Sequence, residues 1–205
     1  MPRHRFSDTR NRIEDAAVAL FVAKGVTETT VRDIARAVDI SEGALYRHFV
    51  SKEQLVQSIF EREYVQFAHK LESLAERAGT ARSKVTTMIG EFCRAHDENP
   101  TLFRFLLFVQ HDQLHKLGAE TLTPVQVVRN VLTAAIASGE LPKQPPDLAT
   151  ALLFGVVLEP VQFAAYGHLP AAMTAMCDRL VAAAWAAVTS VSNVTSVTSV
   201  KEERP

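Results

Sequence analysis

The chain has 205 residues, of which 47% are apolar and 22% are charged, and its formal net charge is −1. This is the composition of an ordinary globular protein with enough apolar side chains for a core. The near-neutral charge does not single out a nucleic-acid binder, although residues 1–52 carry nine Lys and Arg against seven Asp and Glu. The length allows one large domain or a small domain joined to a larger one.

No stretch of the sequence marks the chain for export or for a membrane. The N-terminal MPRHRFSD lacks the apolar core of a secretory signal. The longest apolar candidate, residues 148–166, is interrupted by Glu159 and Pro160. We therefore expect a soluble, cytoplasmic protein in which Cys93 and Cys177 are reduced, with a disulfide between them as the less favoured alternative.

The first predicted helix runs from Ser7 or Asp8 to about Lys24. Its apolar residues recur every three or four positions, as on the buried face of an amphipathic helix. Either Ser7 or Asp8 can cap its start, and Gly25 can end it. The basic residues 1–7 before this helix form either a flexible arm along DNA phosphates or a solvated leader.

Residues 29–49 predict two short helices joined by a tight turn. The first helix has the three-four apolar spacing of a single buried face. Asp39 lies in the turn, and the Ser41 hydroxyl can cap the second helix, which buries Leu45 and Phe49. This pattern is typical of a helix-turn-helix, whose second helix enters the major groove of DNA.

The rest of the chain is predicted to be helical, and we expect an all-α fold. A long helix over about residues 52–78, which Ser51 can cap, connects the N-terminal bundle to the helices after it. Thr29 or Thr30 can cap the helix before the turn, and Thr123 can cap a later helix with Pro124 in its first turn. Residues 141–146 contain three prolines and form a linker. The tail, residues 190–205, alternates Val with polar residues but has no partner strand, so we expect it to be disordered. Further helices are expected over residues 81–97, 100–117, 123–138, 147–167 and 170–189.

Five short motifs occur along residues 8–60: Ile13-x-x-Ala16-Ala17, Leu20-Phe21-x-x-x-Gly25, Thr30-Val31-x-x-Ile34-Ala35, Ser41-x-Gly43-x-Leu45-Tyr46-x-His48-Phe49 and Lys52-Glu53-x-Leu55. Through these motifs, residues 8–60 resemble the DNA-binding domain of TetR-family transcriptional regulators. In one respect the sequence departs from the family, because Asp39 stands in the turn where Gly is usual. Aspartate tolerates a left-handed backbone better than most residues, so we expect the turn to form with some strain.

The resemblance implies a three-helix DNA-binding domain over residues 1–51, including an arm over residues 1–7. It also implies a helical ligand-binding and dimerisation domain over residues 52–189, whose linking helix spans residues 52–78.

On the recognition helix, the small Gly43 and Ala44 allow a close approach to the groove. Tyr46 and His48 suit phosphate oxygens, and Arg47 suits a base edge or a phosphate. The alternative for Arg47 is a solvated charge, and Glu42 either accepts from a cytosine amino group or serves as a spacer beside the phosphates. The full set expected to contact DNA is Thr29, Thr30, Arg32, Ser41, Glu42, Gly43, Ala44, Tyr46, Arg47, His48 and Lys52.

The middle helices are rich in aromatic residues and carry a few polar side chains, as in a pocket for a small, largely apolar ligand. Glu159 interrupts an apolar run beside Pro160, so a buried carboxylate there would need a ligand or an internal cation as its partner. For each aromatic residue an ordinary core position is the alternative. The residues expected to bind the effector are Met88, Phe92, His96, Phe103, Phe105, Gln110, Glu159, Gln162, Phe163 and Tyr166.

The two C-terminal helices combine an almost wholly apolar helix with one rich in alanine, which suits close packing between helices. The alternative is that both belong to the core of the monomer. The resemblance implies a homodimer formed through these helices, a palindromic DNA operator, and a repressor released by its effector.

Other functions have less support in the sequence. His111 and His115 have a spacing that can chelate zinc, but a solvated helix face explains them better, and we expect neither a metal nor a cofactor. An all-helical enzyme is the less favoured alternative, because the sequence contains neither a nucleophile paired with a base nor a Gly-rich phosphate loop. An architectural DNA binder without an effector would not need the long, aromatic-rich C-terminal part.

Overall fold

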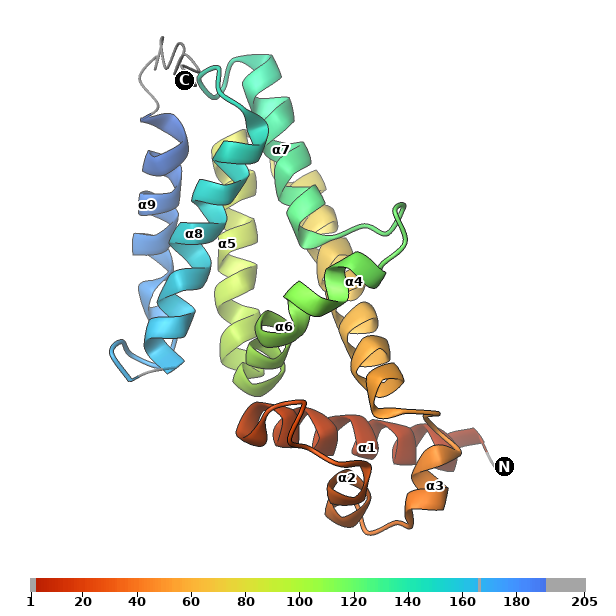
Figure 1. The fold of residues 1–205 in the computed structure, drawn as a ribbon. Coiled ribbons are helices and arrows are strands. Elements are labelled where there is room, and N and C mark those ends of the chain that lie inside the picture. The colour runs from red at the N-terminus through yellow and green to blue at the C-terminus, as the bar shows by residue number, and fades with distance from the viewer. Residues whose placement is uncertain (1–2, 166, 191–205) are drawn as a thin grey trace, which may run out of the picture.

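The computed structural model describes residues 3–165 and 167–190, and within these residues every regular element is helical (Figure 1). The expected all-α fold is confirmed. The α-helices are α1 (Arg3–Lys24), α2 (Val31–Ala37), α3 (Glu42–Tyr46), α4 (Lys52–Arg77), α5 (Ala81–Glu98), α6 (Pro100–Gln113), α7 (Pro124–Ser138), α8 (Pro146–Ala165) and α9 (Cys177–Thr189), with short 3₁₀ helices η1 (Leu114–Lys116) and η2 (Thr174–Met176).

The helices α1, α2 and α3 form a small module at one end of the molecule (Figure 1). Their core does not close on its own, because the first half of α4 and part of α6 complete it. Buried residues of this cluster include Phe21, Ile34, Leu45 and Phe49 from the module, with Leu55, Ile59, Phe60 and Phe105 from α4 and α6. The module is therefore anchored on two helices that continue into the larger part of the chain.

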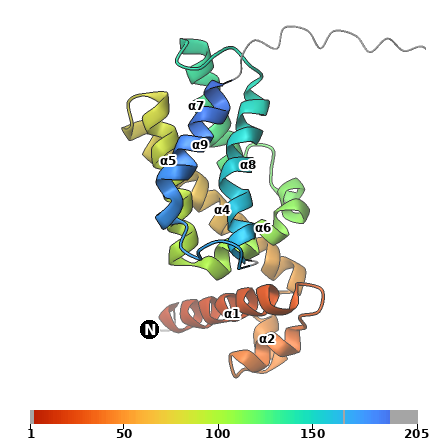
Figure 2. The same ribbon diagram turned by 90° about the vertical axis from the view of Figure 1, so that its left-hand side faces the viewer.

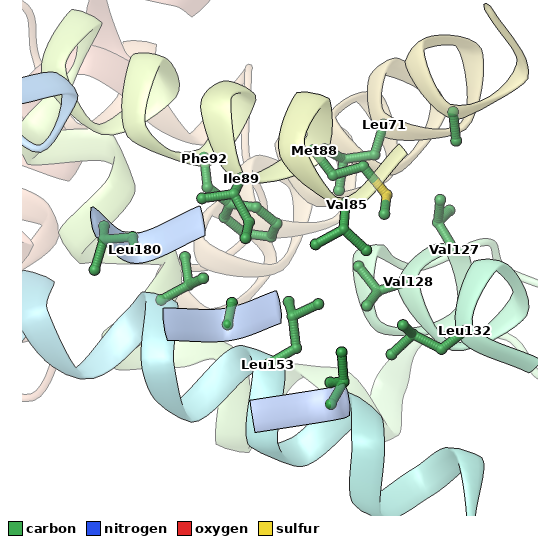
Figure 3. Packing of buried hydrophobic residues seen from close by; sticks show 14 of the residues in the cluster. Leu71, Val85, Met88, Ile89, Phe92, Val127, Val128, Leu132, Leu153 and Leu180 are labelled. Carbon is green, nitrogen blue, oxygen red and sulfur yellow. The ribbon is translucent and has the colours of Figure 1, made fainter. Parts of the chain in front are cut away.

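The second core lies among α4, α5, α7, α8 and α9 (Figure 3). Its buried side chains come from the apolar faces that the three-four spacing predicts, and interdigitate at the centre of the bundle. Labelled examples in Figure 3 are Leu71, Val85, Met88, Ile89, Leu132, Leu153 and Leu180. The long α4 contributes to both cores and so connects the two parts of the chain.

Local capping sets most helix starts. The side chains of Thr30, Ser41 and Ser51 each accept a hydrogen bond from a backbone N–H in the first turn of the following helix. Ser41 and Ser51 were the expected caps, and Thr30 was one of two candidates. Thr123 also caps its helix as expected, with Pro124 in the first turn.

The boundaries of α1, α3, α6 and α9 differ from the sequence prediction. Helix α1 begins at Arg3, so residues 3–7, expected as an arm, continue the helix; no Gly or Pro lies between Arg3 and Lys24 to stop it. Helix α3 ends at Tyr46, and α6 ends at Gln113 before η1.

The last helix was predicted from residue 170, but α9 begins at Cys177. The segment before it is held in a turn by Asp97 of α5, whose carboxylate accepts hydrogen bonds from the backbone N–H groups of Met173 (2.7 Å) and Thr174 (2.9 Å). Three of the alanines assigned to the last helix, at positions 171, 172 and 175, therefore precede it. The tail predicted to be disordered lies, from residue 191 on, outside the described residues.

Candidate functional site

The turn between α2 and α3 has a left-handed backbone at Asp39, where φ is +55°. The Ile40 N–H donates to the Ala35 carbonyl (3.0 Å) and the Asp39 N–H to that of Arg36 (3.2 Å). These two bonds make the Schellman motif that closes a helix when its C′ residue is left-handed. Asp39 is the one non-glycine residue with positive φ in the described ranges. The expected strained turn is confirmed.

Helix α3 presents one face to solvent and buries the other. Leu45 and Phe49 are buried, each with 1% of its surface exposed. Tyr46 is 49% exposed, and Arg47 also faces solvent. A Cβ atom at Gly43 would meet nothing within 4 Å, so packing inside the chain does not require a glycine there. The absence of a side chain at this exposed position leaves room for a partner.

Other predicted DNA contacts at the module surface have mixed surroundings. Arg32 and Glu42 are exposed, whereas Ala44 and His48 are half-buried. Thr30 is exposed, and its side chain forms a capping box with Asp33, in which each residue's side chain accepts from the other's backbone N–H.

Thr29 lies inside the module rather than on its surface. Its side chain is fully buried, and its hydroxyl lies within hydrogen-bonding distance of the carbonyls of Gly25 (2.8 Å) and Leu20 (3.3 Å) at the end of α1. The hydroxyl satisfies carbonyls that the helix end leaves without an internal partner. Thr29 therefore supports the loop before α2.

Lys52 supports the same loop. Its Nζ donates to the carbonyls of Val26 (2.7 Å), Thr27 (3.2 Å) and Thr29 (2.9 Å). An ammonium group has three hydrogen-bond donors, and these contacts use all three. The structure thus places Lys52 and Thr29 in an internal network, apart from the exposed α3 face.

A cavity of about 430 Å³ lies within the larger part of the chain, bounded by α4, α5, α6, α7 and α8. Most of its lining is apolar, and its volume falls in the range of small-molecule pockets. The lining residues are Tyr64, Phe67, Phe92, Phe103, Leu106, Leu107, Gln110, Pro124, Val125, Arg129, Asp147, Thr150, Ala151, Phe154 and Leu158.

The charged residues of this lining are paired with each other. Arg129 of α7 donates from Nε to Asp147 at the start of α8, and both side chains are largely exposed. The hydrogen bond and the charge of Arg129 hold the pKa of Asp147 below its ordinary value. The pair therefore leaves no uncompensated charge at this part of the cavity.

Three of the residues predicted to bind the effector line the cavity: Phe92, Phe103 and Gln110. The ring of Phe92 packs edge-on against those of Phe67, Phe103 and Phe154. His96 lies just behind this wall, with its ring edge-on to Phe103 and a centroid separation of 5.5 Å.

The other predicted ligand contacts lie elsewhere. Met88 belongs to the bundle core (Figure 3). Phe105 faces away from the cavity and stacks on Phe21 of α1, with 5.8 Å between ring centroids. Glu159 and Phe163 are exposed on α8. The prediction that the Glu159 carboxylate is buried is therefore wrong for the single chain. Gln162 lines a smaller neighbouring cavity, and Tyr166 lies outside the described residues.

The cavity also includes residues that the sequence did not single out. Tyr64 and Phe67 lie three positions apart on the linking helix α4, a spacing that places them on one face. Burial raises the pKa of the Tyr64 phenol to about 12. These aromatic residues were the available signal, because they stand in the same half of α4 that enters the larger core.

Two helices touch both the cavity and the N-terminal module. On α6, Phe103 and Leu107 line the cavity, whereas Phe105 is buried against the module. On α4, Arg62 binds Glu14 of α1 at 2.5 Å (Nη1 to Oε2), and the Glu14 side chain is only 3% exposed. Helices α4 and α6 therefore each contact both the cavity and the N-terminal module.

Comparison with known proteins agrees with this architecture. Residues 13–59 match the family model described as bacterial regulatory proteins, tetR family. TtgW of Pseudomonas putida, an uncharacterized HTH-type transcriptional regulator, is 32% identical over 104 residues, which cover 50% of this chain and 75% of TtgW. The chain belongs to the TetR family of transcriptional regulators.

Two further proteins are similar to this TetR-family regulator over part of the sequence or in fold. The HTH-type transcriptional repressor KstR of Mycolicibacterium smegmatis is 34% identical over 95 residues, covering 46% of the chain and about half (47%) of KstR. The crystal structure of the regulator FadR from Bacillus subtilis, in complex with stearoyl-CoA, has a TM-score of 0.70. The structural match covers 88% of this chain and 98% of FadR at 19% sequence identity, and so shows a shared fold.

In this TetR-family regulator, α8 and α9 lie side by side along one face of the molecule (Figure 2). The Pro146–Ala164 segment is long and apolar enough to cross a membrane by length and composition, a test that core helices of soluble proteins also pass. Only 28% of it is buried within the chain. Its exposed residues follow a three-four spacing that forms a continuous stripe: Leu148, Leu152, Gly155, Glu159 and Phe163.

The stripe continues onto the alanine-rich α9, where Ala182, Ala183 and Ala186 are exposed. His111 and His115 are both exposed, and the described residues contain no group of three or more His, Cys, Asp or Glu side chains that could hold a metal ion.

Proposed function

We propose that this TetR-family regulator is a homodimeric, cytoplasmic repressor that a small, largely apolar effector releases from a palindromic operator. The observation that carries the proposal is the double role of α4 and α6. Each helix lines the 430 Å³ cavity with one part and packs against the DNA-binding module with another. The chain thus has an exposed α3 face for DNA, here called the output surface, a cavity, and two helices that connect them.

The output surface is the exposed face of α3. Gly43 and Ala44 allow the helix backbone to approach the floor of the major groove. Tyr46 supplies a phenol for a phosphate oxygen, and Arg47 supplies a bidentate cation for a base edge or a phosphate. Supporting contacts come from the exposed residues Thr30, Arg32, Ser41 and Glu42 and from the half-buried His48. Thr29 and Lys52 are left out because their polar groups are used within the module.

A single helix-turn-helix reads few base pairs, so selectivity requires two copies on related half-sites. The α8–α9 face suits this dimer. Leu148 and Phe163 are 47% and 46% exposed on a largely apolar helix, and such apolar surface is stable in water when a second copy covers it. Gly155 and the exposed alanines of α9 permit close helix approach. A two-fold axis here would present both α3 helices to one DNA face.

The cavity suits a lipophilic effector. Its walls carry four phenylalanines besides Tyr64, and its charged pair is internally neutralised. That FadR of Bacillus subtilis is described in complex with stearoyl-CoA supports a long-chain lipophilic ligand in a chain of this fold. An effector that fits the cavity best when α6 is displaced would bind the DNA-incompetent state more tightly and shift the population towards it.

Substitution of Tyr46 by alanine tests the output surface. We expect Tyr46→Ala to weaken binding to the intergenic DNA beside the coding region roughly tenfold, as loss of one phosphate contact predicts. The half-exposed side chain packs little, so the thermal midpoint of the variant should stay close to that of the wild type. The measurement is a gel-shift titration with circular dichroism melting.

Val50→Ala is the matched control, because Val50 is 75% exposed just beyond α3 and should leave DNA affinity unchanged. Equal DNA affinity of the wild type and Tyr46→Ala would contradict the proposal that this face of α3 contacts DNA.

A further inference from the structure

A second, smaller cavity of about 280 Å³ lies between α6 and α8. It adjoins the main cavity, because Leu107, Gln110 and Leu158 line both. The two spaces therefore share part of one wall, and a ligand longer than the main cavity would have to extend past these three residues to reach both. The remaining lining residues of the smaller space are Arg104, Phe108, Val161 and Gln162.

Arg104 is the charged residue of the smaller cavity. Its Nε atom is buried and has no hydrogen-bond partner. A cationic donor left unpaired away from water is costly, and such groups are rare in folded proteins. No ion pair of Arg104 occurs in the described portion of the chain, whereas Arg129 at the main cavity is neutralised by Asp147.

The position of Arg104 keeps its donors available. The guanidinium lies over the Phe108 ring, with 5.7 Å between Cζ and the ring centroid. Stacking on an aromatic face orients the guanidinium plane and leaves its in-plane N–H groups free to donate. The side-chain amides of Gln110 and Gln162 add further donors in the same lining. The smaller cavity thus combines one unpaired cation with neutral donors.

We propose that the effector is an amphipathic molecule with an anionic head group, a carboxylate or a phosphate, which Arg104 binds in the smaller cavity. The apolar chain of this ligand passes Leu107 and Leu158 into the main cavity. The inference rests on the proposed function, because it names the chemical class of the effector. It also distinguishes Arg104 from Arg129, since an anion at Arg129 would have to displace Asp147.

The test compares ligands with equal alkyl chains and different heads: an even-numbered series of alkyl carboxylates from octanoate to hexadecanoate, the matching alkyl phosphates, alcohols and trimethylammonium salts. Binding to the full-length protein is measured by calorimetry below the critical micelle concentration. We expect the wild type to prefer anionic heads over the alcohol of the same chain length at least tenfold, and to bind the cationic series most weakly. The carboxylate and phosphate arms identify the head that fits.

Two variants assign this preference to Arg104. Arg104→Gln should bring the affinity ratio of carboxylate to alcohol close to one while leaving alcohol binding unchanged, and Arg104→Lys should retain part of the preference. Arg77→Gln is the matched control, because Arg77 is exposed in the last turn of α4 and lines neither cavity, so this variant should keep the full ratio. If Arg104→Gln also lowers the thermal midpoint, alcohol affinity still reports whether the cavity is intact.

A preference for anions that survives in Arg104→Gln, or equal binding of all heads by the wild type, would overturn the head-group assignment and leave the apolar effector site standing. If no alkyl compound of any head binds the wild type, both this inference and the proposed effector cavity are wrong.

Discussion

Asp39 shows how one residue can set both the geometry and the strain of the DNA-binding module. Its φ of +55° is required by the Schellman motif that turns α2 into α3. An L-residue other than glycine pays on the order of 1 kcal/mol for a left-handed backbone. The carboxylate also lies at a helix C-terminus, where a negative charge is unfavourable.

We predict that Asp39→Gly stabilises the protein by about 0.5–1 kcal/mol, because relief of the backbone strain and of the charge exceeds the greater entropy of glycine in the unfolded chain. Asp39→Val should destabilise it by about 1–2 kcal/mol, since a β-branched residue resists positive φ. Urea unfolding measures both. A stability of Asp39→Gly at or below that of the wild type would show that the turn stores no strain.

Residues with local roles were readable from the sequence, and residues with distant partners were not. Ser41 and Ser51 were predicted as caps because a cap bonds to N–H groups two or three positions away. Lys52 was predicted to face phosphates, yet its three carbonyl partners lie 23 to 26 positions earlier in the chain. Composition and spacing carry no signal for such a contact.

At the scale of elements, the faces of α6 explain why the effector site was only partly predictable. Phe103 and Phe105 are two positions apart, so on a helix they point in very different directions. Phe103 lines the cavity and Phe105 packs on Phe21 of the module. The aromatic content of α6 was informative, but the assignment of each ring depended on which neighbours the fold brings to each face.

The junction between α5 and the segment before α9 depends on one carboxylate. Burial alone would raise the pKa of Asp97, but hydrogen bonds from the Thr174 hydroxyl, from His96 and from the backbone N–H groups of Thr174 and Met173 together hold that pKa well below its ordinary value. The charged form is therefore the one that the folded state stabilises. This contribution is complete above the unfolded-state pKa of about 4 and declines as the pH falls below it.

We predict that Asp97→Asn lowers stability at pH 7 and flattens its pH dependence, so that the variant loses less unfolding free energy than the wild type between pH 6 and pH 3. Urea denaturation across this range measures the difference. Thr174→Val, which removes one of the stabilising donors, should flatten the profile in part. Parallel profiles for wild type and Asp97→Asn would mean that this carboxylate does not couple protonation to folding.

For the whole molecule, the sequence was sufficient for the all-helical fold, because that fold follows from local periodicity and capping. It was not sufficient for the cavity, whose walls come from five helices separated along the chain. The buried apolar cluster of the N-terminal module also includes residues of α4 and α6. This shared core joins the two parts of the chain more closely than a boundary between residues 51 and 52 suggests.

We propose that two copies of this TetR-family regulator, paired through the α8–α9 face, read a symmetric DNA site with α3. Selection from random duplexes of about 40 base pairs tests it most directly, with Leu152→Arg as the comparison variant in the middle of the exposed stripe. For the wild type we predict enrichment of a two-fold symmetric sequence whose half-sites are separated by one turn of DNA, about 10 base pairs, or a multiple of it.

Leu152→Arg should sediment as a monomer and lose this enrichment, because a buried arginine on each copy prevents the stripes from packing. Enrichment of an asymmetric single site by the wild type, or of the same symmetric site by Leu152→Arg, would contradict DNA recognition by two copies paired through the α8–α9 face.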